Sequence, residues 1–131
     1  MRPVSLFLAA LVALLAVAIP VSAQTMRVSH SPRELGTVVL RDLTVLRDGK
    51  LVFRVDSNGC TDAASFKVRV SREDGISPKV PHYRLVVERI RIDECKAMVW
   101  DGVLIEVDMQ KDLGLAGAYT ISVENPIFPG S

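Results

Sequence analysis

Two cysteines, Cys60 and Cys95, carry the most reactive side chains of this sequence. Their spacing differs from the Cys-x-x-Cys pattern of redox pairs and many metal sites. In an oxidising compartment an even number of cysteines favours a disulfide. A bridge between them would close a loop of about 36 residues and would stabilise a small domain by roughly 3 to 4 kcal/mol in the chain-entropy model. We therefore predict a Cys60–Cys95 disulfide rather than a metal or redox site.

Oxygen-bearing side chains surround the first cysteine and raise the question of calcium. Asp56, Asn58 and Asp62 lie within a short span, but the glycine follows Asn58 directly and no bidentate Glu follows at the distance that an EF-hand requires. Asp, Asn, Ser and Gly are also common turn residues. We predict a loop pinned by the disulfide, and we interpret Asp93-Glu94 before the second cysteine as loop charges.

The remaining residues with catalytic chemistry form no recognisable set. His30 and His82 each lie beside a proline at an apparent strand edge, which predicts exposed side chains rather than metal ligands. There is no Gly-x-Ser-x-Gly, and a Ser-His-Asp set could be assembled on paper around His82 as in almost any chain. We predict no catalytic residue and no cofactor, and we do not expect an enzyme.

The charges balance and exclude one class of partner. Lys+Arg number 16 and Asp+Glu 15, and Arg2 is the only charge in the first 23 residues. Residues 24–131 therefore have a net charge of zero. Such a balance is unlike the basic surface of nucleic-acid-binding proteins, so no nucleic-acid partner is predicted. Cations such as Lys67 and Arg69 are expected to form a solvated face that discourages edge-to-edge pairing, with a partner-binding face as the alternative.

The elements that must position these residues are strands. Apolar and polar residues alternate over 51–55, 66–70, 103–109 and 119–123, the pattern of strands with one buried face. Only 110–114 could form a helical turn. We predict an all-β fold for residues 24–131, a single domain built as an antiparallel β-sandwich of immunoglobulin-like type with one disulfide. A small closed barrel is the alternative.

Two local features refine this prediction. Around Asp48-Gly49, apolar matching favours a three-residue loop that pairs Leu43 with Phe53 and Val45 with Leu51. In the segment 82–93 the apolar positions change from odd to even, which predicts a bulge or bend near residues 87–89, or a strand that changes sheets there.

Trp100 is the only tryptophan, and it precedes a second Asp-Gly pair. A two-residue turn at Asp101-Gly102 would join strands 96–100 and 103–109 and would pair Trp100 with Val103. Because Val103 belongs to an apolar face, the pairing predicts a core-facing Trp100 that covers the open end of the sandwich. The alternative is that Trp100 and Asp101 contact a partner.

Residues 1–23 have the pattern of a secretory signal peptide. Arg2 supplies the positive start, residues 4–19 are apolar apart from Ser5, and Pro20 precedes Val21-Ser22-Ala23. Cleavage after Ala23 would make Gln24 the first residue and would leave no membrane span. The run is shorter than a spanning helix needs, so an uncleaved anchor is the weaker alternative. We predict a periplasmic or secreted protein.

Several of these segments together resemble small exported bacterial proteins of uncharacterised function. The resemblance rests on 57–62, Phe66-Lys67-Val68, 93–98 and Asn125-Pro126, and it covers most of residues 50 to 128. It implies export and a bridge between Cys60 and Cys95. It implies no activity, cofactor or site residue.

Together these features favour an exported, non-catalytic binding domain. Its expected partner is another envelope or secreted protein, bound through loops or an edge strand. One alternative is a secreted inhibitor or stress-protection protein that uses the loop 71–81, which contains Asp, Gly and Pro. A metal-binding or enzymatic domain is the third hypothesis.

Overall fold

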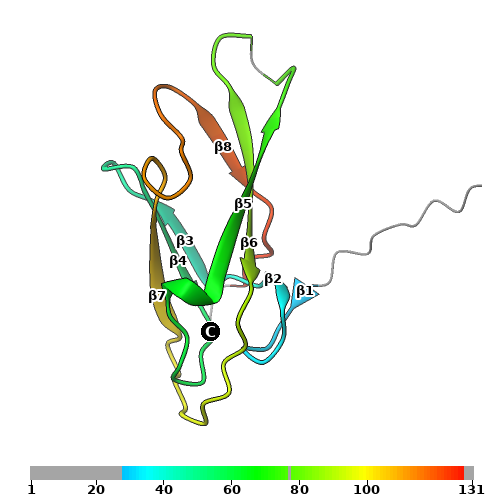
Figure 1. Cartoon of the computed structure of the whole chain (residues 1–131), viewed down its shortest axis with the longest axis vertical. Helices are drawn as coiled ribbons and strands as arrows, with labels where there is room; N and C mark the ends of the chain where they lie inside the picture. Colours follow the sequence, from blue (N-terminus) through cyan, green and yellow to red (C-terminus); the bar gives the residue numbers. More distant parts are fainter. Residues whose placement is uncertain (1–27, 77, 129–131) are drawn as a thin grey trace, which may run out of the picture.

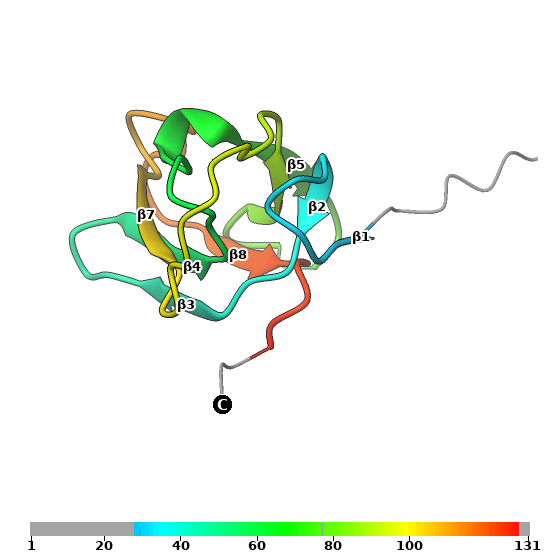
Figure 2. The same ribbon diagram turned by 90° about the horizontal axis from the view of Figure 1, so that it is seen from below.

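The computed structural model describes residues 28–76 and 78–128 (Figures 1 and 2); the predicted signal peptide, residues 1–23, lies outside them. This part of the chain contains strands, one 3-10 turn and no α-helix. The described residues thus contain no helix that is long and apolar enough to cross a membrane. The elements in chain order are β1 (Val28–Ser29), β2 (Gly36–Val38), β3 (Asp42–Val45), β4 (Lys50–Val55), η1 (Ala63–Ser65), β5 (Phe66–Glu73), β6 (His82–Arg89), β7 (Val103–Asp108) and β8 (Thr120–Val123).

The strands form two sheets, so the all-β prediction is confirmed. One sheet has the order β3-β4-β7 and is antiparallel throughout. The other has the order β1-β2-β6-β5, with β8 also pairing with β6. Its β2·β6 and β5·β6 pairs are antiparallel, whereas β1·β2 and β6·β8 are parallel. The second sheet is therefore mixed, which the sequence did not predict.

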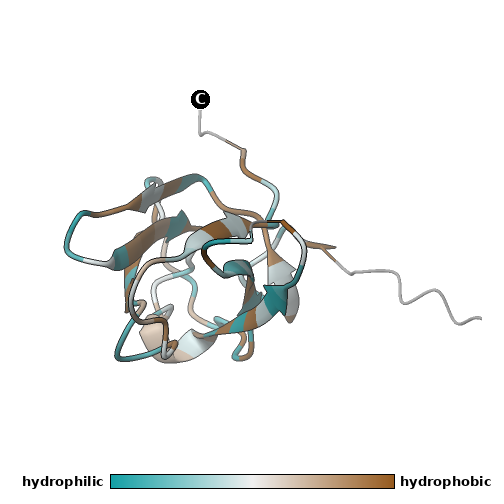
Figure 3. Cartoon of the chain, turned by 90° about the horizontal axis from the view of Figure 1, so that it is seen from above, coloured by the Kyte–Doolittle hydropathy of each residue, from teal (hydrophilic) through white to brown (hydrophobic). Residues whose placement is uncertain are grey.

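The core lies between the two sheets. Apolar residues alternate with polar ones along most of β4 and β5 (Figure 3), and the inward apolar residues from both sheets form one cluster. Phe53 of β4 and Phe66 of β5 meet edge to face across this cluster, with ring centroids 5.7 Å apart. Burial of these side chains is what holds the two sheets together.

The β3–β4 hairpin has the predicted three-residue loop. Leu43 pairs with Phe53 and Val45 with Leu51, and the Leu46 N–H donates to the Lys50 carbonyl at 2.8 Å. Apolar matching across the strands therefore identified the register correctly, because a shift by one residue would turn the whole apolar face of β4 to solvent.

The predicted bulge near residues 87–89 is wrong. Strand β6 pairs with β5 in one continuous register, from His82 opposite Glu73 to Arg89 opposite Phe66. Leu85, Val86 and Val87 are all buried, so β6 carries an apolar run rather than an alternation. The strand ends at Arg89, and the apolar residues beyond it, Ile90 and Ile92, are 54% and 41% exposed. The change of phase marks the end of the strand.

The predicted hairpin between residues 96–100 and 103–109 is also wrong. Strand β7 pairs with β4, with Val103 opposite Val55, and residues 92–99 belong to no strand. Asp101-Gly102 nevertheless lies in a turn, which the Gly102 N–H closes by donating to the Val99 carbonyl at 3.0 Å. The turn thus leads an irregular segment into β7.

Asn125 fills the place along β6 where neither β8 nor β2 pairs with it. The Val87 N–H donates to Asn125 Oδ1 at 2.7 Å, and Asn125 Nδ2 donates to the carbonyls of Val38 and Val87 at 2.8 Å each. Beyond it, the Leu40 N–H donates to Pro126 and the Phe128 N–H donates to Leu40. A buried amide and the C-terminal segment thus complete this sheet.

Candidate functional site

Trp100 is exposed, which corrects the prediction that it covers the core. Its exposed fraction is 75%, and that of Met98 is 72%. The prediction depended on a cross-strand pair between Trp100 and Val103, but Val103 pairs with Val55 instead. Without a strand before the turn, the period-two rule does not relate the side of Trp100 to that of Val103.

The backbone that carries Trp100 is held in place by two arginines. The Trp100 carbonyl accepts a hydrogen bond from Arg41 Nη1 at 2.6 Å, and the Asp101 carbonyl accepts one from Arg54 Nη1 at 3.0 Å. Arg41 is itself oriented by Asp56, with Nε 2.5 Å from Oδ1. We call residues 95–101 the Trp100 loop.

Gly102 fixes the end of this loop. Its φ is +64°, and a Cβ atom at this position would lie 2.2 Å from the Val55 carbonyl oxygen. The close approach of two backbones therefore requires glycine here.

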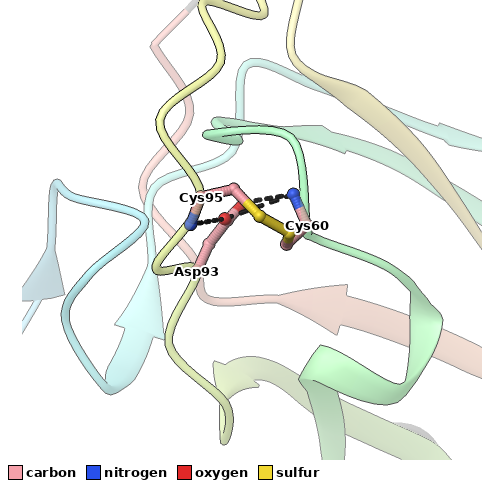
Figure 4. A group of neighbouring side chains, drawn as sticks. All are labelled: Cys60, Asp93 and Cys95. Carbon is pink, nitrogen blue, oxygen red and sulfur yellow. Dashed lines mark hydrogen bonds between the residues drawn. A yellow bond between two sulfur atoms is a disulfide. The ribbon is translucent and has the colours of Figure 1, made fainter.

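The other end of the Trp100 loop is held by the disulfide, which confirms the predicted Cys60–Cys95 pair. The two Cα atoms are 5.6 Å apart, as disulfide geometry allows. Figure 4 shows the Asp93 carboxylate lying against the bridge, with hydrogen bonds to the backbone nitrogens of both cysteines. The bridge and the carboxylate thus act on the same two residues.

Asp93 is a buried acceptor rather than a loop charge, and this corrects our interpretation of it. It is 1% exposed. Hydroxyl donors are Ser57 Oγ at 2.9 Å and Thr61 Oγ1 at 2.6 Å. Backbone N–H donors are those of Asn58, Cys60 and Cys95, at 2.8, 3.1 and 3.1 Å.

This set of donors keeps the Asp93 carboxylate charged. Burial by itself would raise the pKa of Asp93, but the hydrogen bonds from Thr61, Asn58, Ser57 and Cys60 outweigh it and hold the pKa far below its ordinary value. The segment 57–61 therefore uses its polar residues to bind an internal carboxylate.

Arg89 supplies a buried positive charge close to this carboxylate. Its Nη1 donates to Thr61 Oγ1 at 3.1 Å, and Thr61 in turn donates to Asp93, so one hydroxyl links the two charges. Its Nη2 donates to the Asp56 carbonyl at 2.9 Å, and its guanidinium carbon lies 4.7 Å from the centre of the Phe66 ring. Burial lowers the pKa of Arg89, against the opposing effect of Asp93 and Asp56. The network is internal and stabilises the loop.

Cys60, Asp93 and Cys95 have the composition of a metal-binding cluster but not its free ligand atoms. One potential ligand atom of each lies within 4.8 Å of the others. Metal ligation requires thiolates, whereas these sulfurs are joined in a disulfide, and both carboxylate oxygens already accept hydrogen bonds. In the oxidised protein the cluster is structural.

The segment that suggested calcium also has its acidic groups engaged. Asp56 pairs with Arg41, and Asp62 Oδ1 pairs with Arg91 Nη2 at 2.5 Å. Asn58 Nδ2 donates to the Asp93 carbonyl at 3.3 Å. These contacts fold the loop and do not converge on a common centre.

His82 lies among hydroxyls in an arrangement that superficially resembles a catalytic triad. Its Nε2 is 3.1 Å from Ser122 Oγ, and its Nδ1 is 2.8 Å from Thr120 Oγ1. The nearest carboxylate, Glu73, lies 3.8 Å from Nε2, the nitrogen that also meets the serine, and it is paired with Arg84. A triad places its acid on the opposite nitrogen. This group is therefore a hydrogen-bonded contact between β6 and β8, and His82 is less exposed than predicted.

Two other candidates lie elsewhere. His30 is exposed, as predicted, and its ring lies near that of Phe128, with centroids 6.4 Å apart. The inhibitor alternative rests on the segment 71–81, but residues 71–73 belong to β5, so the loop between β5 and β6 is 74–81. This loop borders a pocket of about 120 Å³ lined by residues such as Arg72, Asp74 and Pro78. In Figure 1 this loop lies at the top, whereas the Trp100 loop lies at the bottom.

Comparisons of the chain with protein-family models, with curated proteins and with solved structures gave no match. The geometry of the chain itself is therefore the basis for a functional proposal.

Proposed function

We propose that this chain is an exported, non-catalytic domain that binds another envelope or secreted protein through the Trp100 loop. The pattern of residues 1–23 and the resemblance to small exported bacterial proteins support export. The disulfide supports the same conclusion, because such bonds persist in periplasmic and extracellular compartments. We also propose that the two sheets are arranged as in an immunoglobulin-like sandwich.

The exposed Trp100 on an immobilised backbone is the observation that carries the proposal. Tryptophan is enriched among residues that dominate protein interfaces, because its large ring buries much apolar area and loses little conformational entropy. Here the ring is three-quarters exposed, while Arg41 and Arg54 hold the carbonyl groups of Trp100 and Asp101. Binding of a partner would therefore cost little conformational entropy in the Trp100 loop.

Met98 gives the surface a second apolar contact and indicates the chemistry of the partner. It is also exposed, and its flexible thioether adapts to irregular apolar surfaces. Lys96 and Asp101 flank these residues with one charge of each sign. The surface thus fits a protein with an apolar pocket and a mixed polar rim.

Photo-crosslinking in cells that export the protein tests the proposal. A photoreactive amino acid at position 98 should give a defined adduct with an envelope protein, and Trp100→Ala should abolish that adduct. The matched control is Ile76→Ala, which truncates a 57% exposed apolar residue in the loop 74–81. Trp100→Ala should leave the free energy of unfolding within about 0.5 kcal/mol of wild type, since it removes no core contact.

Three results would overturn the proposal. An adduct formed from position 76 and not from position 98 would favour the inhibitor or stress-protection alternative. An adduct from position 98 that is unaffected by Trp100→Ala would show that Trp100 does not carry the binding. The absence of any adduct from position 98 would show that the Trp100 loop binds no protein.

A further inference from the structure

Strand β5 leaves one of its edges unpaired along its whole length. It is eight residues long, and within residues 28–76 and 78–128 it pairs only with β6. Its register carries no bulge and its sequence no proline, two devices that commonly protect an edge strand from another strand. Charged side chains are the remaining protection, and their placement decides which strand could bind.

The hydrogen bonds of β6 show which groups of β5 face outward. Val87 bonds to Asn125 and the Leu85 carbonyl accepts from Glu124, so the odd-numbered residues of β6 bond away from β5. In an antiparallel strand the backbone groups of successive residues point to alternate sides, so the even-numbered residues of β6 bond to β5. Their partners in the register are the odd-numbered residues of β5, such as Arg69 opposite Val86, and these bond to β6. The N–H and C=O groups of Val68, Val70 and Arg72 therefore point away from β6.

The side chains of β5 place complementary charges at its two ends. Lys67, Arg69, Ser71 and Glu73 share one face of the strand, while Val68 and Val70 lie half-buried on the core face. Glu88, which is opposite Lys67, forms its ion pair with Arg69 at 3.0 Å. Glu73 at the end of the strand already contacts Arg84 of β6 through one carboxylate oxygen. In an antiparallel pair of identical strands, Lys67 of one copy and Glu73 of the other could complement each other as a second ion pair of this carboxylate.

We propose that two copies of this chain form a dimer by antiparallel pairing of β5, with Val70 on the two-fold axis. In this register Lys67 of each copy lies opposite Glu73 of the other, and Arg69 lies opposite Ser71. Val70 exchanges both of its backbone hydrogen bonds with its symmetry mate, as its outward-facing groups require. The five-stranded sheet then continues across the axis.

Neighbouring registers bring cations together. With Arg69 on the axis, two guanidinium groups lie opposite each other; with Val68 on the axis, Lys67 lies opposite Arg69. Like charges directly opposite each other destabilise a strand pair. With Ser71 on the axis, Arg69 lies opposite Glu73, but Lys67 then lies opposite residue 75, beyond the end of β5. The same charges that discourage random edge pairing thus favour the alignment that pairs the whole of 67–73.

Sedimentation equilibrium of the oxidised exported protein tests the dimer. We expect a dissociation constant on the order of 100 µM, because a single strand pair buries less area than a standard interface. Lys67→Glu should weaken the dimer roughly tenfold or more by opposing Glu73 with a like charge. Arg47→Glu makes the same change of charge at the exposed tip of the β3–β4 hairpin and should have no effect.

Single cysteine substitutions test the register. Opposed residues of a hydrogen-bonded pair have Cα atoms about 5.5 Å apart, within the range of a disulfide. Val70→Cys should therefore give a covalently linked dimer on oxidation with Cys60–Cys95 intact, and Arg69→Cys should not. A protein that stays monomeric at millimolar concentration, a dimer that Lys67→Glu leaves unchanged, or linkage through position 69 instead of 70 would each overturn the proposal.

Discussion

Asp93 is a buried carboxylate whose direct partners among the described residues are neutral donors. Hydroxyl and backbone N–H groups from 57–61 surround it, together with the Cys95 N–H, and Arg89 acts on it only through Thr61. Hydrogen bonds to a charged acceptor are stronger than those between neutral groups. Asp93 therefore organises the disulfide end of the molecule.

Asp93→Asn should lower the free energy of unfolding by about 3 kcal/mol. The amide nitrogen that replaces one carboxylate oxygen cannot accept hydrogen bonds from the N–H and O–H donors that face it, so some of these donors lose their acceptor. Urea unfolding of the oxidised protein, with the disulfide checked by intact mass, measures this loss. Glu94→Gln removes the neighbouring exposed charge and should change stability by less than about 0.5 kcal/mol. Equal effects of the two variants would contradict the role assigned to Asp93.

The stabilisation by Asp93 should depend on pH. Because the folded-state pKa is lowered, the contribution is complete above the unfolded-state pKa of about 3.9 and is lost as pH falls from there towards the folded-state pKa. The gap in unfolding free energy between wild type and Asp93→Asn should be constant from pH 7 to pH 5. It should then narrow as the pH is lowered towards 2.

Comparison with the variant isolates Asp93 from other acidic groups. The pKa of Asp62 is lowered by its hydrogen bond with Arg91, and that of Asp108 is lowered by the Lys111 N–H. Both groups are present in both proteins, so their effects cancel in the difference. A gap that stays constant down to pH 2 would show that the Asp93 charge does not contribute.

At the scale of elements, the turn before β7 depends on one glycine. Gly102→Ala should destabilise the protein by more than about 2 kcal/mol, because the new methyl group meets the Val55 carbonyl. Gly117→Ala is the matched control: its φ is +77°, but a Cβ there has nothing within 4 Å. The control should cost about 1 kcal/mol from its backbone conformation alone. Thermal unfolding of both variants distinguishes steric contact from conformational strain.

Local pairing was predictable from the sequence, whereas long-range pairing was not. The β3–β4 hairpin follows from neighbouring residues, because matching Leu43 with Phe53 is enough to select the loop length. The partner of β7 is β4, which is far away in sequence, and Val103 fits equally well opposite Trp100 or Val55 by hydrophobicity. An alternating pattern identifies the buried face of a strand and not its neighbour.

The candidate site was only partly predictable for a related reason. An even count of cysteines was enough to predict the disulfide. The role of Asp93 depends on its being brought against 57–61 by a long-range contact, and its sequence context, two residues before Cys95, resembles an ordinary loop. The exposure of Trp100 was not predictable, because residues 92–99 form no strand and Trp100 therefore has no cross-strand partner that would turn it towards the core.

At the scale of the whole molecule, the disulfide and the Asp93 network are two independent connections between the same segments. Reduction, or replacement of both cysteines by alanine, should lower the free energy of unfolding by about 3 to 4 kcal/mol. Near-UV circular dichroism should still show native packing at 25 °C, since the hydrogen bonds to Asp93 use backbone and hydroxyl groups that reduction leaves in place. Loss of that signal on reduction alone would show that Asp93 cannot hold the loops without the bridge.

The position of Asn125 in the chain has a consequence for the order of folding. Asn125 forms hydrogen bonds with Val38 and Val87, and residues 126–128 form them with Leu40. The segment that contains β2 thus depends on residues that are synthesised almost 90 positions later. A polypeptide that emerges from a pore with its N-terminal side first cannot close the five-stranded sheet until Asn125 has passed through. In the export that we propose, the chain would therefore stay unfolded during translocation, and the native state would form only after Asn125 has crossed the membrane.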